Sequence, residues 1–150
     1  MDDNINIRSA VATDLPAIHG LVGELADYEK ALPSFTATIQ QYREEFAAGT
    51  FSAHVAETSE GEIIGMTLYY DTFSTWKGKM LYLEDFVVRR SYRGKGIGKA
   101  LFDEFKAEAE RRGCALIKWQ VLDWNTPAVE FYERQGATIE KEWWNGKMFL

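Results

Sequence analysis

Three glycines at alternating positions, with basic residues among them, form the stretch of this sequence best suited to chemistry. They lie in the run Arg93-Gly94-Lys95-Gly96-Ile97-Gly98-Lys99. Glycines leave backbone N–H groups uncovered and let a ligand approach the main chain closely. An apolar run precedes them and a helical pattern follows, so we expect a helix N-terminus, with its positive dipole end, at this loop. The combination indicates a site for a phosphate or pyrophosphate group.

Two adjacent carboxylates interrupt the apolar strand that leads into this loop. Glu84 and Asp85 lie between Leu81-Tyr82-Leu83 and Phe86-Val87-Val88. Carboxylates within a buried strand are unfavourable unless they are hydrogen-bonded or solvated, so the pattern marks a functional position or a bulge. In a regular strand the two side chains would point to opposite faces, and Asp85 would then have a structural role.

The spacing of the glycine loop excludes two common phosphate motifs. No Gly-Lys-Ser/Thr ends it, as a Walker loop requires, and the third glycine of a dinucleotide fingerprint is missing from its place. The pattern Arg93-x-x-Gly96-x-Gly98 resembles instead the coenzyme A pyrophosphate loop of the GNAT N-acetyltransferases. From this motif alone, a plain glycine-rich turn between strand and helix stays open.

Three further stretches resemble the diamine (spermidine/spermine-type) acetyltransferase branch of that family, which also includes thialysine acetyltransferases. They are residues 26–30, 81–88 and 124–137. The resemblance covers essentially the whole chain. It implies transfer of an acetyl group from acetyl-CoA to a primary amine of a small cationic substrate, by direct attack in a ternary complex. The amine itself (diamine, polyamine, or lysine- or thialysine-like) stays open, as do a protein or peptide amine as acceptor and a non-catalytic acyl-CoA-binding module.

The resemblance also implies roles for residues at matching positions. Tyr132 would protonate the departing coenzyme A thiolate, and Glu84 would accept the proton of the amine through water. Tyr132 could instead pack in the core beside Phe131, and Asn125 could simply cap its helix. The implied substrate contacts are Tyr28, Glu29, Glu84 and Trp119. The implied cofactor contacts are the backbone of Phe86, Val87 and Val88, the loop residues Arg93, Gly94, Lys95, Gly96, Ile97, Gly98 and Lys99, and Asn125.

Composition narrows the class of partner. The net charge of −6 over 150 residues weighs against nucleic acid and is compatible with a cationic substrate. No metal-ligand spacing occurs, so we expect acetyl-CoA as cosubstrate and no metal. Members of the resembled branch pair their last strands across a dimer, which implies a homodimer here.

Sequence features also bear on localisation. The single cysteine, Cys114, excludes an intramolecular disulfide and is consistent with a cytoplasmic protein. No apolar run is long enough to cross a membrane, and the acidic first residues lack the features of a signal peptide. We therefore expect a cytoplasmic enzyme without membrane partners.

The order of the expected elements predicts one GNAT domain over residues 1–150, with an α/β fold. A central mixed sheet of about six or seven strands would be flanked by about four helices on both faces. The strand–helix–strand unit over 80–122 should be a crossover between parallel strands. The expected helices cover 13 to about 29, 37–48, 97–112 and 125–135. The expected strands cover 5–12, 51–56, 63–70, 80–88 and 115–122, with a closing hairpin over 137–150.

Overall fold

The computed structural model of the chain describes residues 4–150. It divides into two compact units, one ending at Gln120 and one covering Val121–Leu150. The acidic residues 1–3, which entered the signal-peptide argument, lie outside the described residues. The strands are β1 (Asn6–Ser9), β2 (Ser52–Glu57), β3 (Ile63–Ser74), β4 (Gly78–Val88) and β5 (Leu116–Trp119). The helices are α1 (Leu15–Tyr28), α2 (Ile39–Ala47), α3 (Ile97–Arg111) and α4 (Thr126–Arg134).

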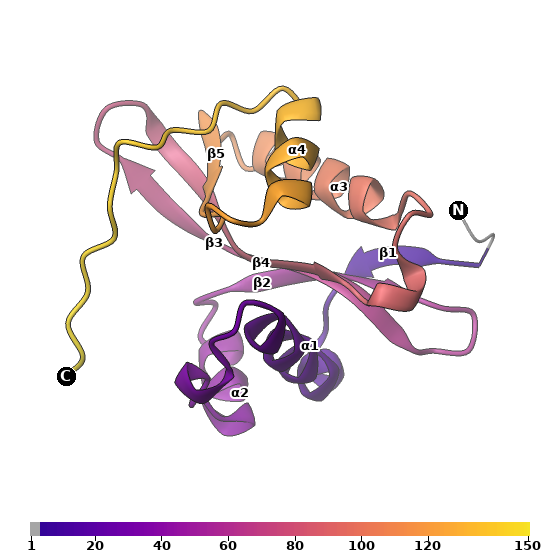
Figure 1. Cartoon of the computed structure of the whole chain (residues 1–150). Helices are drawn as coiled ribbons and strands as arrows, with labels where there is room; N and C mark the ends of the chain where they lie inside the picture. The colour runs from indigo at the N-terminus through magenta and orange to yellow at the C-terminus, as the bar shows by residue number, and fades with distance from the viewer. Residues whose placement is uncertain (1–3) are drawn as a thin grey trace. The chain divides into compact units, whose positions relative to one another are not determined.

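The first unit is built on one mixed sheet with the strand order β1-β2-β3-β4-β5. Neighbouring strands are antiparallel except β4 and β5, which are parallel and joined by α3. Helices α1 and α2 cover one face of the sheet and α3 covers the other (Figure 1). The mixed sheet and the parallel crossover pair are therefore confirmed. Among the described residues the sheet has five strands, fewer than expected.

Two apolar clusters hold β4 between the helices. On the α1 face, the fully buried Leu15, Ile18 and Leu21 belong to the same cluster as Val87 of β4. Their three- and four-residue spacing places them on one side of the helix. On the α3 face, Ile97 and Leu101 pack with Ile64 of β3. Burial of each such side chain contributes about 1.5–3 kcal/mol, so both faces of β4 are fixed by packing.

The C-terminal segment departs from the expected hairpin. Residues 137–150 form neither helix nor strand. Their apolar side chains stay largely exposed, with Trp144 at 94% and Phe149 at 85%. An isolated two-stranded hairpin is marginal at best without a sheet or helix to cover one face. The Asn145-Gly146 turn signal was therefore not sufficient to form strands on both sides of it.

A second departure concerns residues 71–79, which the sequence had left between the expected strands 63–70 and 80–88. Residues 72–74 continue β3, where Phe73 pairs with Lys79 of β4. The turn is limited to residues 75–77. Phe73 and Trp76 are exposed at this end of the long β3–β4 hairpin. No helix in the described part of the chain is long and apolar enough to span a membrane.

Candidate functional site

A β-bulge in β4 explains the two adjacent carboxylates. Leu68 of β3 pairs with Asp85, whereas the next residue, Tyr69, pairs with Leu83. Glu84 is therefore the extra residue of the bulged strand. The sequence had suggested either function or a bulge at this position, and the structure shows the bulge.

The bulge brings both carboxylates to the same face of the sheet. Leu83 is paired with Tyr69, whose ring packs on Phe105 of α3, so Leu83 lies on the α3 face. Glu84 follows on the opposite face by ordinary alternation. Asp85 shares its face with Val87, which lies in the cluster of α1. The expectation that Asp85 would point away from Glu84 is wrong, because it assumed a regular strand.

The face that carries these carboxylates is acidic. Burial, with further effects of Glu84 and Glu29, raises the pKa of Asp85 to about 7. Burial likewise raises the pKa of Glu29, which follows the last turn of α1. Burial first, and then the charges of Asp85 and Glu84, raise the pKa of Tyr42 in α2 to about 12. These shifts are consistent with Glu84 and Asp85 lying on the face of the sheet that α1 and α2 cover.

Glu84 itself lies at the exposed side of this cluster. Its Oε1 accepts a hydrogen bond of 2.7 Å from the hydroxyl of Tyr70 in β3. The Tyr70 ring stacks on Tyr82, with 5.4 Å between ring centroids. Burial and this bond raise the pKa of Tyr70, so the phenol stays protonated and donates. The bond fixes the direction of the Glu84 carboxylate.

The glycine loop has the backbone conformation that an anion site requires. Gly94 and Gly96 have φ values of +77° and +83°, which residues with a side chain rarely adopt. Gly96 precedes the first residue of α3, and no side chain caps that helix. The first-turn N–H groups of α3 therefore remain available to a ligand. Lys99, in the same turn, pairs with Asp103 at 2.7 Å.

The outer edge of β4 is open next to this loop. The parallel ladder with β5 runs only from Met80 to Leu83. The N–H of Arg89 donates to Ile64 O in β3 at 2.8 Å. Because backbone groups of a strand face its two edges alternately, those of Phe86 and Val88 face the open edge and those of Val87 face β3. Of the three expected backbone contacts, Val87 therefore faces β3, whereas Phe86 and Val88 face the edge of β4 on which a strand-like ligand would add.

The carbonyl oxygen of Val88 at this edge already accepts a hydrogen bond from within the protein. Arg93 Nε donates to Val88 O at 2.8 Å. The guanidinium carbon of the same residue lies 5.5 Å from the centre of the Tyr28 ring. Arg93 therefore links the glycine loop to the open edge of β4 and to the end of α1.

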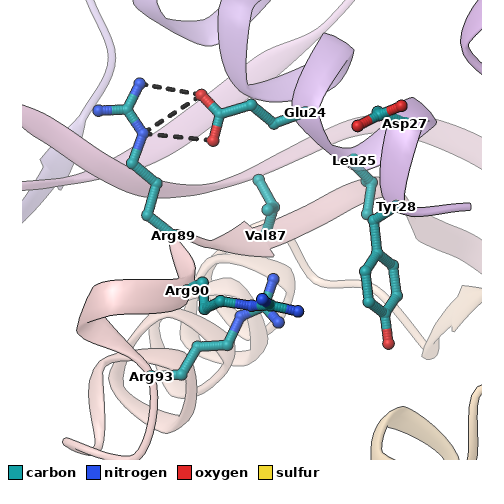
Figure 2. A pocket seen from close by; sticks show the side chains of 8 residues that line it. All are labelled: Glu24, Leu25, Asp27, Tyr28, Val87, Arg89, Arg90 and Arg93. Carbon is teal, nitrogen blue, oxygen red and sulfur yellow. Dashed lines mark hydrogen bonds and ion pairs between the residues drawn. The ribbon is translucent and has the colours of Figure 1, made fainter.

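A cavity of about 370 Å³ lies between the end of α1 and the start of the loop. Figure 2 shows Arg90 and Arg93 extending toward the space that Tyr28 faces. Arg89 instead forms ion pairs with Glu24 and Glu62, at 2.9 and 2.8 Å. The free positive charge at this cavity therefore comes from Arg90 and Arg93. The complete lining consists of Glu24, Leu25, Asp27, Tyr28, Val87, Arg89, Arg90 and Arg93.

Comparisons with known proteins identify the family of the chain. The model of the acetyltransferase (GNAT) family matches residues 21–137. The chain belongs to the GNAT acetyltransferase family. It is 36% identical to a thialysine N-epsilon-acetyltransferase of Bos taurus, over 94% of this chain and 89% of the relative. It is 33% identical to a human spermidine/spermine N(1)-acetyltransferase-like protein, over 90% of this chain but 21% of that longer protein.

Solved structures support the fold independently. An aminoglycoside acetyltransferase from an uncultured soil metagenomic sample, crystallised with trehalose, superposes with a TM-score of 0.82 at 20% identity. The superposition covers 99% of this chain and 98% of that one. The GNAT fold expected from the sequence is confirmed, and the chain is an enzyme of the N-acetyltransferase type.

The remaining predicted residues of this GNAT acetyltransferase lie elsewhere. Tyr132 and Asn125 belong to the second compact unit, at α4. The Asn125 side chain accepts a hydrogen bond from the N–H of Ala128 at 3.4 Å. It therefore caps α4, which is one of the two roles that the sequence suggested for it. The Tyr132 ring contacts Phe131 edge-on. The ring of Trp119 packs on Phe102 of α3, which places it on the opposite face from Glu84.

Sequence reasoning missed one group of possible metal ligands in the acetyltransferase. His54, Glu104 and Glu108 offer ligand atoms within 4.8 Å of one another. Glu104 and Glu108 are four residues apart on α3, but His54 lies 50 residues before them, so no local spacing could reveal the group. Both glutamates are already paired with Arg111, at 2.6 and 2.8 Å. The buried His54 forms a hydrogen bond through its Nδ1 with the Tyr69 hydroxyl, at 2.8 Å.

Proposed function

We propose that this acetyltransferase moves an acetyl group from acetyl-CoA to a primary amine of a small cationic substrate. The observation that carries the proposal is the pair of carboxylates, Glu84 and Asp85, on one face of β4 with Glu29 nearby. An ammonium group is attracted to such a face, and it must lose a proton before its nitrogen can attack. The relatives named for thialysine and for spermidine/spermine support an amine that carries a further positive charge.

Acetyl-CoA would lie along the open edge of β4 and across the glycine loop. The pantetheine arm would pair with the backbone of Phe86 and Val88, as a peptide adds to a sheet edge. The pyrophosphate would contact the residues from Arg93 to Lys99 and the first turn of α3. The uncapped helix start and the two glycines with positive φ support this placement. Asn125 would add a contact from the start of α4.

The proposed reaction is direct transfer within a ternary complex. A carboxylate at the bulge takes a proton from the ammonium, and the family resemblance assigns Glu84, acting through water. The neutral nitrogen attacks the thioester carbonyl, whose oxygen receives a hydrogen bond from the N–H of Phe86. The carbon–sulfur bond then breaks, Tyr132 gives its proton to the sulfur, and the nitrogen loses its second proton, which restores the Tyr132 phenol. Tyr28 and Glu29 are the proposed substrate contacts, whereas Trp119, predicted together with them, packs on the α3 face and is not among them.

The complete enzyme is proposed to be a homodimer formed from one domain per chain. The exposed apolar side chains near the C-terminus support this proposal, because such side chains usually mark an interaction surface. Trp143, Trp144 and Phe149 are exposed at 70%, 94% and 85%. A second copy of the chain, in the cytoplasm, is the partner that we propose for them.

The first experiment measures free thiol released from acetyl-CoA by the purified protein. The amine panel contains putrescine, spermidine, spermine, lysine, thialysine and a short peptide. We expect turnover with one class of small cationic amine, and turnover with the peptide alone would overturn the substrate proposal. Absence of turnover with every amine, despite binding of acetyl-CoA, would overturn the proposed reaction.

The Tyr132→Phe variant tests the proposed acid within the same assay. We expect kcat to fall by roughly 10²–10⁴-fold with little change in the KM for acetyl-CoA, because only the phenolic proton is removed. Phe131→Leu is the matched control on the same helix, and it should retain most of the activity. Full activity in Tyr132→Phe would remove Tyr132 from the mechanism.

A further inference from the structure

The carboxyl group of Asp85 is unusual among the charged groups of this sheet face. Within the described residues it forms no hydrogen bond and no ion pair, although its side chain is half-buried. Buried carboxylates in folded proteins are normally hydrogen-bonded or paired with a cation. The bulge at Glu84 causes this arrangement, because it turns Asp85 toward α1 and α2.

Two acidic groups near Asp85 oppose its negative charge. Glu84 precedes it in β4, and Glu29 approaches from the end of α1. Tyr42 of α2 is the third titratable neighbour, and it is neutral at ordinary pH. Burial first, and then the charges of Glu84 and Glu29, raise the pKa of Asp85 to about 7, a value at which a carboxyl can take up a proton during turnover.

Glu84 differs from Asp85 in its exposure and in its hydrogen bonding. It is exposed, and the Tyr70 hydroxyl donates to its Oε1 at 2.7 Å. Glu84 is therefore suited to hold a positive charge at the entrance of the acidic face, whereas Asp85 is suited to bind a proton behind it.

We infer that the bulge makes Glu84 and Asp85 a device of two carboxylates with separate roles: Glu84 holds the substrate ammonium, and Asp85 is the final acceptor of the proton that the ammonium loses. This inference deepens the proposed function and rests on it. It reassigns the end point of the proton that the family resemblance gave to Glu84.

The balance of the step is simple. One N–H bond of the ammonium breaks and one O–H bond forms on Asp85, so the amine becomes neutral and Asp85 loses its charge. Glu84 keeps its negative charge throughout and remains bonded to Tyr70. After acetyl transfer, Asp85 returns the proton to solvent, because the overall reaction of an ammonium with a thioester releases one proton.

The test compares pH profiles of kcat/KM between pH 5 and 9 for the wild-type enzyme, Asp85→Asn and Glu84→Gln. For the wild-type enzyme we expect kcat/KM to fall as the pH is lowered through a pKa near 7. Asp85→Asn should lose this limb, and its kcat should drop by about 10²-fold or more. Glu84→Gln should keep the limb but show a raised KM for the amine. Glu60→Gln, in an exposed turn, is the control that should match the wild-type enzyme.

A weakly basic amine separates a chemical role from a structural one. A fluorinated alkylamine is already neutral at the assay pH and needs no proton acceptor before it attacks. Asp85→Asn should therefore be much less impaired with this amine than with an ordinary diamine. Equal impairment with both amines would overturn the inference, as would a limb near pH 7 that survives in Asp85→Asn.

The outcomes distinguish this inference from the proposed function. If the wild-type enzyme shows no turnover with any amine, the proposed function fails, and this inference fails with it. If the wild-type enzyme is active but the limb disappears in Glu84→Gln, only the present assignment fails. Because Glu84→Gln is a separate variant at an exposed position, that result does not depend on how well Asp85→Asn folds.

Discussion

Asp85 should cost the folded enzyme stability, since its carboxyl is easier to ionise in the unfolded chain. Its pKa is about 7 in the folded protein, against an ordinary value of 3.8. The folded state therefore binds more protons between these two values, so the contribution of Asp85 to stability declines as pH rises from about 4 to 7. Above pH 7 the penalty has its full size, up to roughly 4 kcal/mol for a shift of this size.

Asp85→Asn should accordingly stabilise the protein at pH 8 and have little effect near pH 4. Urea unfolding at the two pH values measures this difference, with Glu60→Gln as the control for loss of a surface charge. A variant that is less stable than the wild-type enzyme at pH 8 would contradict the prediction. The same substitution is expected to remove activity, so this position would trade stability for function.

The element that carries the site is β4, and its irregularity shows how far sequence reasoning can reach. Two carboxylates in an apolar run correctly pointed to a bulge or a functional position. The face of the sheet on which the Asp85 side chain lies could not be predicted, because one inserted residue reverses the alternation of every side chain that follows it. The sequence also could not predict which edge of β4 the N–H and C=O groups of Val87 face, because this depends on which edge of β4 pairs with β3.

The glycine loop is the second element of the site, and its glycines have different reasons to be there. Gly96 has a φ of +83°, and a side chain there would meet no atom within 4 Å. Gly98 needs no positive φ, and a methyl group there would make ordinary contacts, the nearest at 3.7 Å to Phe86. Packing within the protein therefore does not require glycine at position 98.

Gly96→Ala and Gly98→Ala should separate stability from cofactor binding. Gly96→Ala should lower the free energy of unfolding by about 1–2 kcal/mol, because alanine is strained at this φ. Gly98→Ala should leave stability unchanged or slightly higher, since alanine favours the helix. Both variants should raise the KM for acetyl-CoA. A Gly98→Ala variant with unchanged KM would argue against close approach of pyrophosphate to the first turn of α3.

For the whole molecule, the order and type of the elements up to α4 followed from the sequence. The strong periodicities of α1 and α3, together with their start signals, account for this agreement. The final hairpin was wrong, because strand propensity and a turn signal cannot supply the edge that a strand must pair with. Residues 137–150 carry a strand-like composition without a partner among the described residues.

The exposed C-terminal aromatics lead to a prediction about oligomeric state. We expect the wild-type enzyme to be dimeric in solution and Trp144→Glu to shift it toward monomer, because a charge would be buried in the interface. Light scattering coupled to size-exclusion chromatography measures the mass directly. Trp76→Glu, at the exposed end of the β3–β4 hairpin, serves as a comparison of equal chemistry. A monomeric wild-type enzyme would contradict the proposed homodimer.

The hydrogen bond from Arg93 Nε to Val88 O has a consequence for the binding of acetyl-CoA and the release of coenzyme A. In the free enzyme an arginine occupies the backbone acceptor that the pantetheine arm is proposed to take. Binding must therefore exchange one partner for another, with the pyrophosphate drawing the guanidinium away. The reverse exchange would help spent coenzyme A to depart, because the strand edge regains its own partner as the product leaves. Arg93 would thus compete with the pantetheine arm for the edge of β4, although the loop that carries Arg93 also helps to bind the cofactor.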